Sequence, residues 1–422
     1  MPFTPPQSIA PLLARPVAVL GAGVSGQGVL LLLGAIGATG VLYDERADHA
    51  ARVFTATEAA THGLVVFSPG FAPEHPWLST ARAAGCTCLG ELDFASLFWR
   101  GEVIAVTGTN GKTSLTEFLA HALNAAGRRA HVTGNVGYPF SRFVVEQMGQ
   151  VDVAVCEVSS FQAETLQHFR PTATLWTNFA EDHLERHPGM PAYFAAKCRL
   201  LERTMRGGVF IGSSVQRFAL VAGQALPPVV PVATEGQPAD IRLGGSIFAS
   251  YPQRENFILA AAWWRQTGLP PSLLYSAAET FRLGQHRLTR VAEKAGVAYW
   301  NDSKATNFHA VEAALATFSS PVLWIGGGKA KGGDLGAFVG RIARQLKHAF
   351  LIGETQAALL AHCAQFRVAA TACTSLAEAV QKARALATAG DQVVLSPGFA
   401  SFDMFRGYDD RGRQFESLVE NL

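Results

Sequence analysis

The sequence predicts an α/β protein of three domains with mostly parallel sheets. Short apolar runs rich in β-branched residues alternate with helical patterns along the whole chain, and this alternation restarts twice, near residues 100 and 284. A chain of 422 residues is also too long for one ordinary hydrophobic core. We expect the domains to span residues 1–99, 100–284 and 285–422.

The expected strands are apolar runs that turn residues interrupt. They are Pro16–Leu20 and Val41–Tyr43 in the first domain; Val103–Thr107, Val151–Val158 and Thr172–Thr177 in the second; and Val297–Trp300, Val322–Ile325, Phe350–Ile352 and Val393–Leu395 in the third. The stretch from about residue 207 to residue 248 is rich in Gly, Pro and Val and shows little helical periodicity.

Composition excludes several classes of protein. Lys and Arg number 35 against 33 Asp and Glu, and no basic run indicates a nucleic-acid partner. The six cysteines include no C-x-x-C pair, which is typical of scattered thiols in a reducing cytosol. Met1–Pro16 lacks the pattern of a secretory signal. The uncharged run 16–43 is long enough to span a membrane, but its glycines favour a strand, a turn and a helix. We therefore expect a cytoplasmic protein without a membrane or nucleic-acid partner.

A glycine-rich turn, Gly21-Ala22-Gly23-Val24-Ser25-Gly26, lies between the first expected strand and a helix. Such glycines allow a tight turn, so that the helix N-terminus faces a phosphate or pyrophosphate. Asp44, which ends the next strand, could accept a hydrogen bond from a ribose hydroxyl or could simply end the strand. The motif alone is a weak signal, and it does not distinguish a dinucleotide from a nucleotide-sugar or from a structural turn.

A stronger motif is Thr107-Gly108-Thr109-Asn110-Gly111-Lys112-Thr113-Ser114, again between a strand and a helix. Its backbone N–H groups can surround the β- and γ-phosphates of a nucleotide, its lysine can neutralise them, and the Thr113 hydroxyl can bind Mg²⁺. Val106 stands where the usual NTPase spacing has glycine. The motif predicts that the chain binds ATP or GTP.

Three further residues could complete a magnesium nucleotide site. Glu157 ends an apolar strand, His183 follows another one, and Lys197 lies fourteen residues beyond His183. Carboxylate oxygen is a ligand that Mg²⁺ prefers, and the ends of parallel strands are where α/β proteins bind ligands. Taken singly, Glu157 could form an ion pair, His183 could be a structural histidine, and Lys197 could be a solvated helix lysine.

Together these motifs resemble the Mur ligase family, in order and through all three domains. The resemblance rests on the Thr107–Thr113 loop, Glu157–Gln162, Asp182–His187, Ala196-Lys197, Asn301–Asn307 and Leu395-Ser396-Pro397. Within the family, Asp302–Asn307 and Ala400–Phe405 most resemble the ligases that add glutamate. The resemblance implies Rossmann-like first and third domains around a central domain like that of P-loop ATPases.

The resemblance also implies roles for individual residues. The UDP-sugar would contact Gly21, Gly23, Val24, Ser25, Gly26, Asp44, Arg46, Ser68, Pro69, Gly70, Asn135, Ser159 and His183. ATP would contact Gly108, Thr109, Asn110, Gly111, Lys112, Thr113, Ser114, Asn256, Arg287 and Asp302, with His286 beside Arg287. The acceptor glutamate would contact Lys304, Thr306, Lys331, Ser401, Phe402 and Tyr408. Catalysis would rest on Lys112, Glu157, His183 and Lys197.

The implied activity is ATP-dependent ligation of glutamate, D-glutamate in preference to L-glutamate, to UDP-N-acetylmuramoyl-L-alanine in peptidoglycan precursor synthesis. A carboxylate would attack the γ-phosphate to give an acyl phosphate and ADP, and the glutamate amine would then displace phosphate. Two Mg²⁺ ions are implied, one held by Thr113 and Glu157, the other by His183 and a carbamylated Lys197. We expect the enzyme to act as a monomer.

Some positions depart from the family pattern and leave alternatives open. Pro252-Gln253 replaces His-Asn ahead of Asn256, Ala330 replaces an acidic residue before Lys331, and Gly398-Phe399 replaces Ala-Cys. These changes could alter adenine contacts or favour L-glutamate or another amino acid. A nicotinamide-dependent oxidoreductase would explain the first glycine turn but not Lys112, Glu157, His183 and Lys197. A non-catalytic nucleotide-binding protein would not need the whole metal set.

Overall fold

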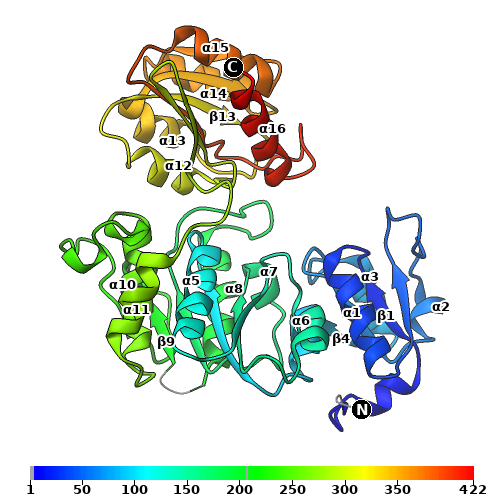
Figure 1. Ribbon diagram of the computed structural model, residues 1–422. Coiled ribbons are helices and arrows are strands. Elements are labelled where there is room, and N and C mark those ends of the chain that lie inside the picture. The colour runs from blue at the N-terminus through cyan, green and yellow to red at the C-terminus, as the bar shows by residue number, and fades with distance from the viewer. Residues whose placement is uncertain (1–3, 206–207) are drawn as a thin grey trace. The chain divides into compact units, whose positions relative to one another are not determined.

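The computed structural model describes residues 4–205 and 208–422, so the start of Met1–Pro16 and residue 207 of the helix-poor stretch lie outside it. The chain forms two compact units. The first contains the described residues up to Phe179 and those of Pro191–Phe281, and the second contains Ala180–Met190 and Arg282–Leu422. The described residues form three separate sheets, two in the first unit and one in the second (Figure 1). The domain boundaries at residues 99 and 284 remain a prediction.

The first sheet has four parallel strands in the order β2-β1-β3-β4. Residues 16–43 form β1, α1 and β2, as their glycines predict, and in the described part of the chain no helix is long and apolar enough to cross a membrane. The elements are β1 (Val17–Leu20), β2 (Gly40–Tyr43), β3 (Leu64–Phe67), β4 (Thr87–Gly90), the 3₁₀ helix η1 (Ala10–Ala14), α1 (Val24–Ala35), α2 (Ala56–Ala59), α3 (Pro76–Ala83) and α4 (Glu91–Ser96).

The second sheet has six parallel strands in the order β10-β9-β8-β5-β7-β6. Its strands are β5 (Glu102–Thr107), β6 (Ala130–Gly134), β7 (Val153–Glu157), β8 (Ala173–Trp176), β9 (Val209–Ile211) and β10 (Val230–Pro231). Its helices are α5 (Lys112–Ala125), α6 (Phe140–Gln147), α7 (Ser160–Ala163), α8 (Met190–Arg203), α9 (Ser213–Val221), η2 (Ile241–Leu243), η3 (Ile247–Ala249), α10 (Gln253–Trp264) and α11 (Pro271–Thr280). Helix α9 lies in the stretch where the sequence showed little helical periodicity. Only Val215 and Ala219 of this helix are buried, so its sequence carries too few buried apolar residues to produce a clear periodic pattern.

Buried carboxylates join the first two sheets into one packed unit. Glu91, at the start of α4, accepts hydrogen bonds from the Ser141 N–H at 2.7 Å and the Ser141 hydroxyl at 2.6 Å. Burial raises the pKa of Glu91. A Cβ atom at Gly28 of α1 would lie 2.5 Å from the same hydroxyl, so this close approach requires glycine. The Gly21–Gly26 turn and the Thr107–Ser114 loop, both predicted to bind ligands, therefore belong to one unit.

The third sheet is parallel except for β11, in the order β11-β12-β16-β13-β14-β15. Its strands are β11 (Thr289–Lys294), β12 (Val297–Asn301), β13 (Val322–Gly327), β14 (Leu346–Ile352), β15 (Ala370–Ala372) and β16 (Gln392–Leu395). Its helices are α12 (Phe308–Leu315), α13 (Leu335–Ile342), η4 (Ala343–Gln345), α14 (Gln356–Gln365), α15 (Leu376–Leu386) and α16 (Tyr408–Glu420).

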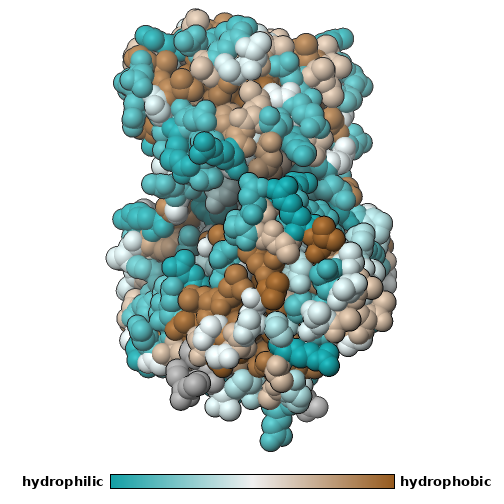
Figure 2. Space-filling view, turned by 90° about the vertical axis from the view of Figure 1, so that its right-hand side faces the viewer, coloured by the Kyte–Doolittle hydropathy of each residue, from teal (hydrophilic) through white to brown (hydrophobic). Residues whose placement is uncertain are grey.

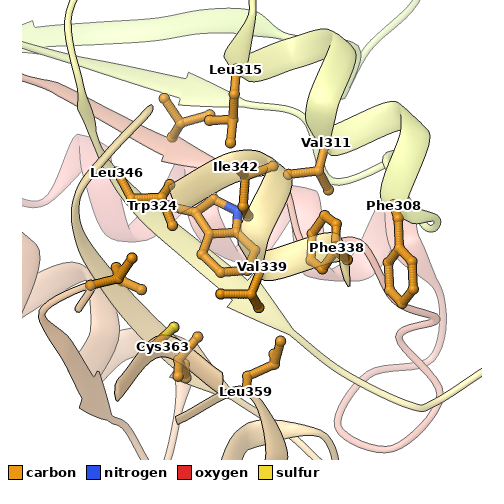
Figure 3. Close-up of a cluster of buried hydrophobic side chains, with 14 of the residues drawn as sticks. Phe308, Val311, Leu315, Trp324, Phe338, Val339, Ile342, Leu346, Leu359 and Cys363 are labelled. Carbon is orange, nitrogen blue, oxygen red and sulfur yellow. The ribbon is translucent and has the colours of Figure 1, made fainter. Parts of the chain in front are cut away.

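Alternation along the strands divides the core of the second unit between two faces of this sheet. Trp324 of β13 packs with α12, α13 and α14, whereas its neighbours Leu323 and Ile325 pack with α15 and α16. Figure 3 shows the Trp324 indole at the centre of the first cluster, with Phe338, Val339 and Ile342 around it. Helices on both faces make this a doubly wound sheet, as predicted.

The surface follows the usual distribution of residue types. Figure 2 shows hydrophilic residues over much of the displayed face, with hydrophobic residues gathered in smaller patches. Exposed large apolar side chains include Leu220, Val221 and Ile241.

Two adjacent leucines of α14 test this account of the core. Leu359 is fully buried in the Trp324 cluster, whereas Leu360 is 37% exposed. Leu359→Ala should lower the free energy of unfolding of the second unit by about 2–5 kcal/mol through lost burial and a cavity. Leu360→Ala should lower it by less than about 1 kcal/mol. Urea denaturation followed by tryptophan fluorescence measures both, and equal losses would contradict the packing described.

Candidate active site

The loop between β5 and α5 has the backbone that phosphate binding requires. Gly108 and Gly111 have φ angles of 148° and 78°, which favour glycine. Gly111 is the N-cap of α5, and a Cβ atom there would lie 2.7 Å from Asn256 Oδ1 of α10. Asn256 therefore packs directly on the loop. The first N–H groups of a helix have no partner within the helix, so the N-terminus of α5 is suited to an anion.

Residues after β8 hold this loop in place. Asn178 accepts from the Asn110 N–H at 2.9 Å and donates to the Asn110 carbonyl at 3.1 Å. The Thr177 hydroxyl donates to the same carbonyl at 2.6 Å. The Thr109 N–H donates to the Asn178 carbonyl at 3.0 Å. Since β8 is adjacent to β5 in the sheet, these bonds link the ends of two neighbouring strands.

A pair of oxygen atoms lies at the start of α5. The Thr113 hydroxyl donates to Glu157 Oε2 at 2.6 Å, and Asn135 Nδ2 donates to Glu157 Oε1 at 2.8 Å. Glu157 ends β7 and is 2% exposed. The structure thus brings together three residues that follow or end neighbouring strands and that the sequence predicted for the site.

Two lysines of the site share one acceptor. Lys112 Nζ donates to the carbonyls of Gly108 and Thr109 at 3.0 and 2.7 Å. Lys197 Nζ of α8 donates to the same Gly108 carbonyl at 2.9 Å. Lys197 is 1% exposed, and its Nζ lies 4.9 Å from the centre of the Tyr193 ring. The Lys197 ammonium is therefore buried and lies close to a second ammonium.

The glycine turn of the first sheet is also packed as a ligand-binding turn. Gly21 has a φ of 101°, and a Cβ atom at Gly26 would lie 1.8 Å from the Gly21 carbonyl oxygen. Asp44 accepts from the Ala22 N–H at 2.7 Å, so its carboxylate also holds this turn. Ser68 Oγ, close to Gly21, is buried and has no hydrogen-bond partner in residues 4–205 and 208–422. A ligand oxygen could satisfy this hydroxyl.

The other residues predicted for the UDP-sugar have simpler surroundings. Val24 and Ser25 are the first residues of α1, after the N-cap Gly23. The backbone N–H of Arg46 donates to Asp44 at 2.9 Å, and Pro69-Gly70 follow Ser68 beyond β3. Ser159 caps α7 through a reciprocal pair of bonds with Gln162. The Ser159 hydroxyl therefore has a structural partner already.

Asp302, which is buried, and Arg287, which is half-buried, lie close enough in the second unit to interact electrostatically. Asp302 follows β12 and accepts from the Ser396 hydroxyl at 2.8 Å and the Leu288 N–H at 3.0 Å. Burial raises the pKa of Asp302 to about 7, although these bonds and the Arg287 and Arg411 cations oppose the rise. Arg287 Nη2 is buried without a hydrogen-bond partner among the residues described. Such a group favours an anionic ligand.

The predicted acceptor residues form two groups within the second unit. Lys304 Nζ lies 3.3 Å from the Tyr408 hydroxyl and 4.8 Å from the centre of its ring. Lys331 Nζ donates to the Thr306 hydroxyl at 3.3 Å. Ser401 is buried and Phe402 is 71% exposed.

Asp182, which sequence reasoning left out of the site, connects the Lys331 group to His183. Its carboxylate accepts from Asn307 Nδ2 at 3.0 Å and from the His183 N–H at 3.0 Å, and it lies 3.6 Å from Lys331 Nζ. His183 itself has a φ of 56°. The segment Ala180–Met190 that carries both residues belongs to the second unit, whereas Lys197 belongs to the first. A metal shared by His183 and Lys197 therefore remains a proposal.

Comparison with known sequences decides the family. The Mur ligase middle domain matches residues 106–256, and the Mur ligase glutamate ligase domain matches residues 286–399. The UDP-N-acetylmuramoylalanine–D-glutamate ligase of Gloeobacter violaceus is 36% identical, with 96% of this chain and 99% of the relative covered. The chain belongs to the Mur ligase family. The corresponding enzyme of Mycobacterium avium is 33% identical over 98% of both chains.

Solved structures support the three-domain Mur ligase fold. The UDP-N-acetylmuramate–alanine ligase of Thermotoga maritima is similar with a TM-score of 0.60 and 15% identity, covering 96% of this chain and 99% of that one. The MurF ligase of the same organism, in complex with ADP, has a TM-score of 0.58 and 15% identity, covering 87% and 97%. At these identities the likeness concerns the fold alone.

Two of the three unusual segments of this Mur ligase have structural partners. Gln253 begins α10 and accepts from Asn256 Nδ2 at 3.0 Å. Gly398 has a φ of 80°, and Phe399 is buried against the rings of Phe308 and Phe338. Gly398 and Phe399 also line a pocket with Thr306, Lys331 and Asp182. Nothing in the structure explains Ala330.

Asp302 makes stability depend on pH. Its pKa in the folded state is about 7, above its ordinary value of 3.8, so the folded protein keeps a proton that the unfolded chain loses. The free energy of unfolding of the second unit should therefore fall as pH rises from about 4 to about 7. Asp302→Asn should remove this contribution. Urea unfolding of both proteins without nucleotide, across this pH range, measures the difference, and parallel profiles would contradict the assignment.

Proposed function

We propose that this protein is the ATP-dependent ligase that joins D-glutamate to UDP-N-acetylmuramoyl-L-alanine in peptidoglycan precursor synthesis. The observation that carries the proposal is the end-to-end similarity to D-glutamate ligases, at 36% identity over 96% of the chain. Such a reaction needs a loop that binds phosphate, oxygen atoms that can bind a metal, and charged groups that can bind the acceptor. The Gly108–Ser114 loop, the Thr113–Glu157 pair and charged groups of the second unit such as Lys331 are suited to these tasks.

The residues at the start of α5 fit a magnesium ion. Thr113 Oγ1 and Glu157 Oε2 are hard oxygen donors 2.6 Å apart, beside a loop suited to phosphate. Magnesium bound there would neutralise charge on the transferring phosphoryl group. Thr113 and Glu157 would hold it, and Asn135 would orient the Glu157 carboxylate.

In the first step the lactyl-alanine carboxylate attacks the γ-phosphorus of ATP, the bond to the β,γ-bridging oxygen breaks, and an acyl phosphate and ADP result. Lys112 and the N–H groups of the Gly108–Ser114 loop would hold the β- and γ-phosphates in line with the attacking oxygen. The bonds from Asn178 and Thr177 keep the loop in shape before the nucleotide arrives. Arg287, with its unsatisfied buried nitrogen, would contact a phosphate, and Asp302 the ribose.

In the second step the amine of glutamate attacks the acyl carbon, and phosphate leaves from the tetrahedral intermediate as the amide bond forms. Lys331 and Thr306, which already contact each other, would bind a glutamate carboxylate, with Lys304, Ser401, Phe402 and Tyr408 completing the acceptor site. Water must be excluded because it would hydrolyse the acyl phosphate.

The UDP-sugar would bind at the first sheet. The Gly21–Gly26 turn at the start of α1 suits a diphosphate, and Ser68 offers an unsatisfied hydroxyl beside it. Asp44, which already accepts from the Ala22 N–H, would also accept a hydrogen bond from the ribose. We further propose a cytoplasmic, monomeric enzyme without nucleic-acid or membrane partners.

Lys197 completes the proposal as a carbamate that binds a second Mg²⁺ together with His183. Carbamylation by CO₂ would replace the buried cation, which shares the Gly108 carbonyl with Lys112, by an anionic oxygen ligand. The carbamate would thereby remove the electrostatic cost of two ammonium groups on one carbonyl.

The proposal predicts strict dependence on three substrates. With Mg²⁺, ATP and UDP-N-acetylmuramoyl-L-alanine, D-glutamate should give ADP, phosphate and a product whose mass equals both substrates less water. L-Glutamate should react at least about 100-fold less well. The amine and the two carboxylates of the wrong enantiomer cannot all reach their partners at once, so polar groups of the site are left unpaired. Equal or better use of L-glutamate would assign that specificity to the Gly398-Phe399 region. No product with any amino acid would reject the ligase function.

Carbamylation of Lys197 predicts a spectroscopic signal. In carbon-13 bicarbonate, the protein should show a carbamate resonance that disappears in Lys197→Arg and persists in Lys382→Arg, a surface control whose partner is Glu378. Removing the carbamate should also lower kcat by at least about 100-fold, as expected when a metal ligand is lost. An active wild type without a Lys197-dependent resonance would refute the modification.

A further inference from the structure

Arg411 is an unusual buried cation in the second unit. It lies in the first turns of α16, and its side chain is 0% exposed. In the described ranges no carboxylate forms an ion pair with it, although Asp403 and Asp302 are close enough to attract it, and a buried guanidinium normally requires an ion pair or a full set of hydrogen bonds. Burial lowers the pKa of Arg411 to about 10, so it stays charged at neutral pH. Burying this charge is energetically unfavourable, and in the mechanism above Arg411 contacts no substrate.

The guanidinium instead joins two loops. Its Nε donates to the Ser303 hydroxyl at 3.0 Å and its Nη2 to the Ser303 carbonyl at 2.9 Å. Nη1 and Nη2 also donate to the Phe399 carbonyl, both at 3.3 Å. The Ser303 hydroxyl in turn donates to the Tyr408 carbonyl at 2.7 Å, at the start of the same helix. One planar side chain therefore fixes the separation of Ser303 and Phe399.

These loops leave the carboxyl ends of adjacent strands. Ser303 follows β12 and Phe399 follows β16, and β13 is the next strand in the sheet. The loop after β13 is tied in as well, because the Lys329 N–H donates to the Ala400 carbonyl at 2.8 Å and a Cβ atom at Gly328 would lie 3.4 Å from Arg411 Nη1. The guanidinium thus bonds to two of these loops and lies close to the third.

Each of the loops carries residues proposed to bind the acceptor. Lys304 and Thr306 follow Ser303, Ser401 lies two residues beyond Phe399, and Lys331 lies two residues beyond Lys329. A shift of either carbonyl would move charged groups that must contact one small amino acid. Binding groups misplaced by about 1 Å can lose most of their effect on the reaction.

We propose that Arg411 is a positioning residue for the acceptor amino acid: it sets the spacing of the Ser303 and Phe399 loops and so the geometry of the glutamate site. This inference rests on the proposed function, because it assigns the Ser303 and Phe399 loops to the acceptor. Arginine suits the task because its rigid fork donates in several fixed directions at once, whereas lysine offers a compact point charge.

Arg411→Lys tests the proposal, with Arg413→Lys as the matched control. Arg413 lies on the same helix but is exposed and pairs with Asp409. In Arg411→Lys the KM for glutamate should rise at least about tenfold, because misplaced binding groups weaken acceptor binding, while the KM values for ATP and the UDP-sugar stay within about twofold. Acyl phosphate formation without glutamate, trapped with hydroxylamine, should be unchanged. Arg413→Lys should match the wild type in every measurement.

Chemical rescue separates positioning from a general loss of folding. Guanidinium ion at millimolar concentration should lower the raised KM for glutamate in Arg411→Ala and leave Arg413→Ala unchanged. Equal increases of all three KM values in Arg411→Lys, or a loss of activity that follows only its fall in thermal stability, would overturn the proposal. An inactive wild type would instead reject the proposed ligase function, and an active wild type with an unchanged Arg411→Lys variant would reject this inference alone.

Discussion

The hydrogen bond between Thr113 and Glu157 is the contact on which the proposed chemistry depends. It joins the helix after β5 to the end of β7, the adjacent parallel strand. Because parallel strands bring their carboxyl ends to one edge, Asn135 after β6 and Asn178 after β8 reach the same place from either side. Residues that follow or end four strands thus hold the Gly108–Ser114 loop and the Thr113–Glu157 pair in one place.

In the second unit, too, parallel strands bring the loops at their carboxyl ends to one edge of the sheet. Loops after β12, β13 and β16 carry the residues that we propose for the acceptor, and Arg411 donates hydrogen bonds to two of these loops. The segment Ala180–Met190 belongs to this unit although the chain on both sides of it belongs to the first. Asp182 therefore links His183 to Asn307 and Lys331 within the second unit.

The sequence predicted the parts of this arrangement that local patterns encode. Apolar runs predicted eight strands to within two residues of their observed bounds, whereas the strand expected at Phe350–Ile352 begins four residues earlier, at Leu346. The phosphate loop was evident from its glycines and lysine. Helix α9 was missed because it buries only two residues. The run Asn178–His183 stood out in the sequence, but Asn178 and Asp182 received no role of their own because their partners are distant in the chain. Arg411 was not noticed at all, since it meets Ser303 across 108 positions. The position of Asn178 just after β8 was a usable signal.

In the mechanism that we propose, phosphoryl transfer at the Thr113–Glu157 end of the second sheet activates the acyl group. Labelling the alanine carboxylate of the UDP-sugar with oxygen-18 and analysing the released phosphate by phosphorus NMR tests it most directly. We expect one labelled oxygen to pass from the carboxylate to inorganic phosphate in each turnover. The amine breaks the bond between the acyl carbon and the bridging oxygen, so this oxygen leaves with the phosphate. Unlabelled phosphate, or label in a nucleotide, would contradict the account.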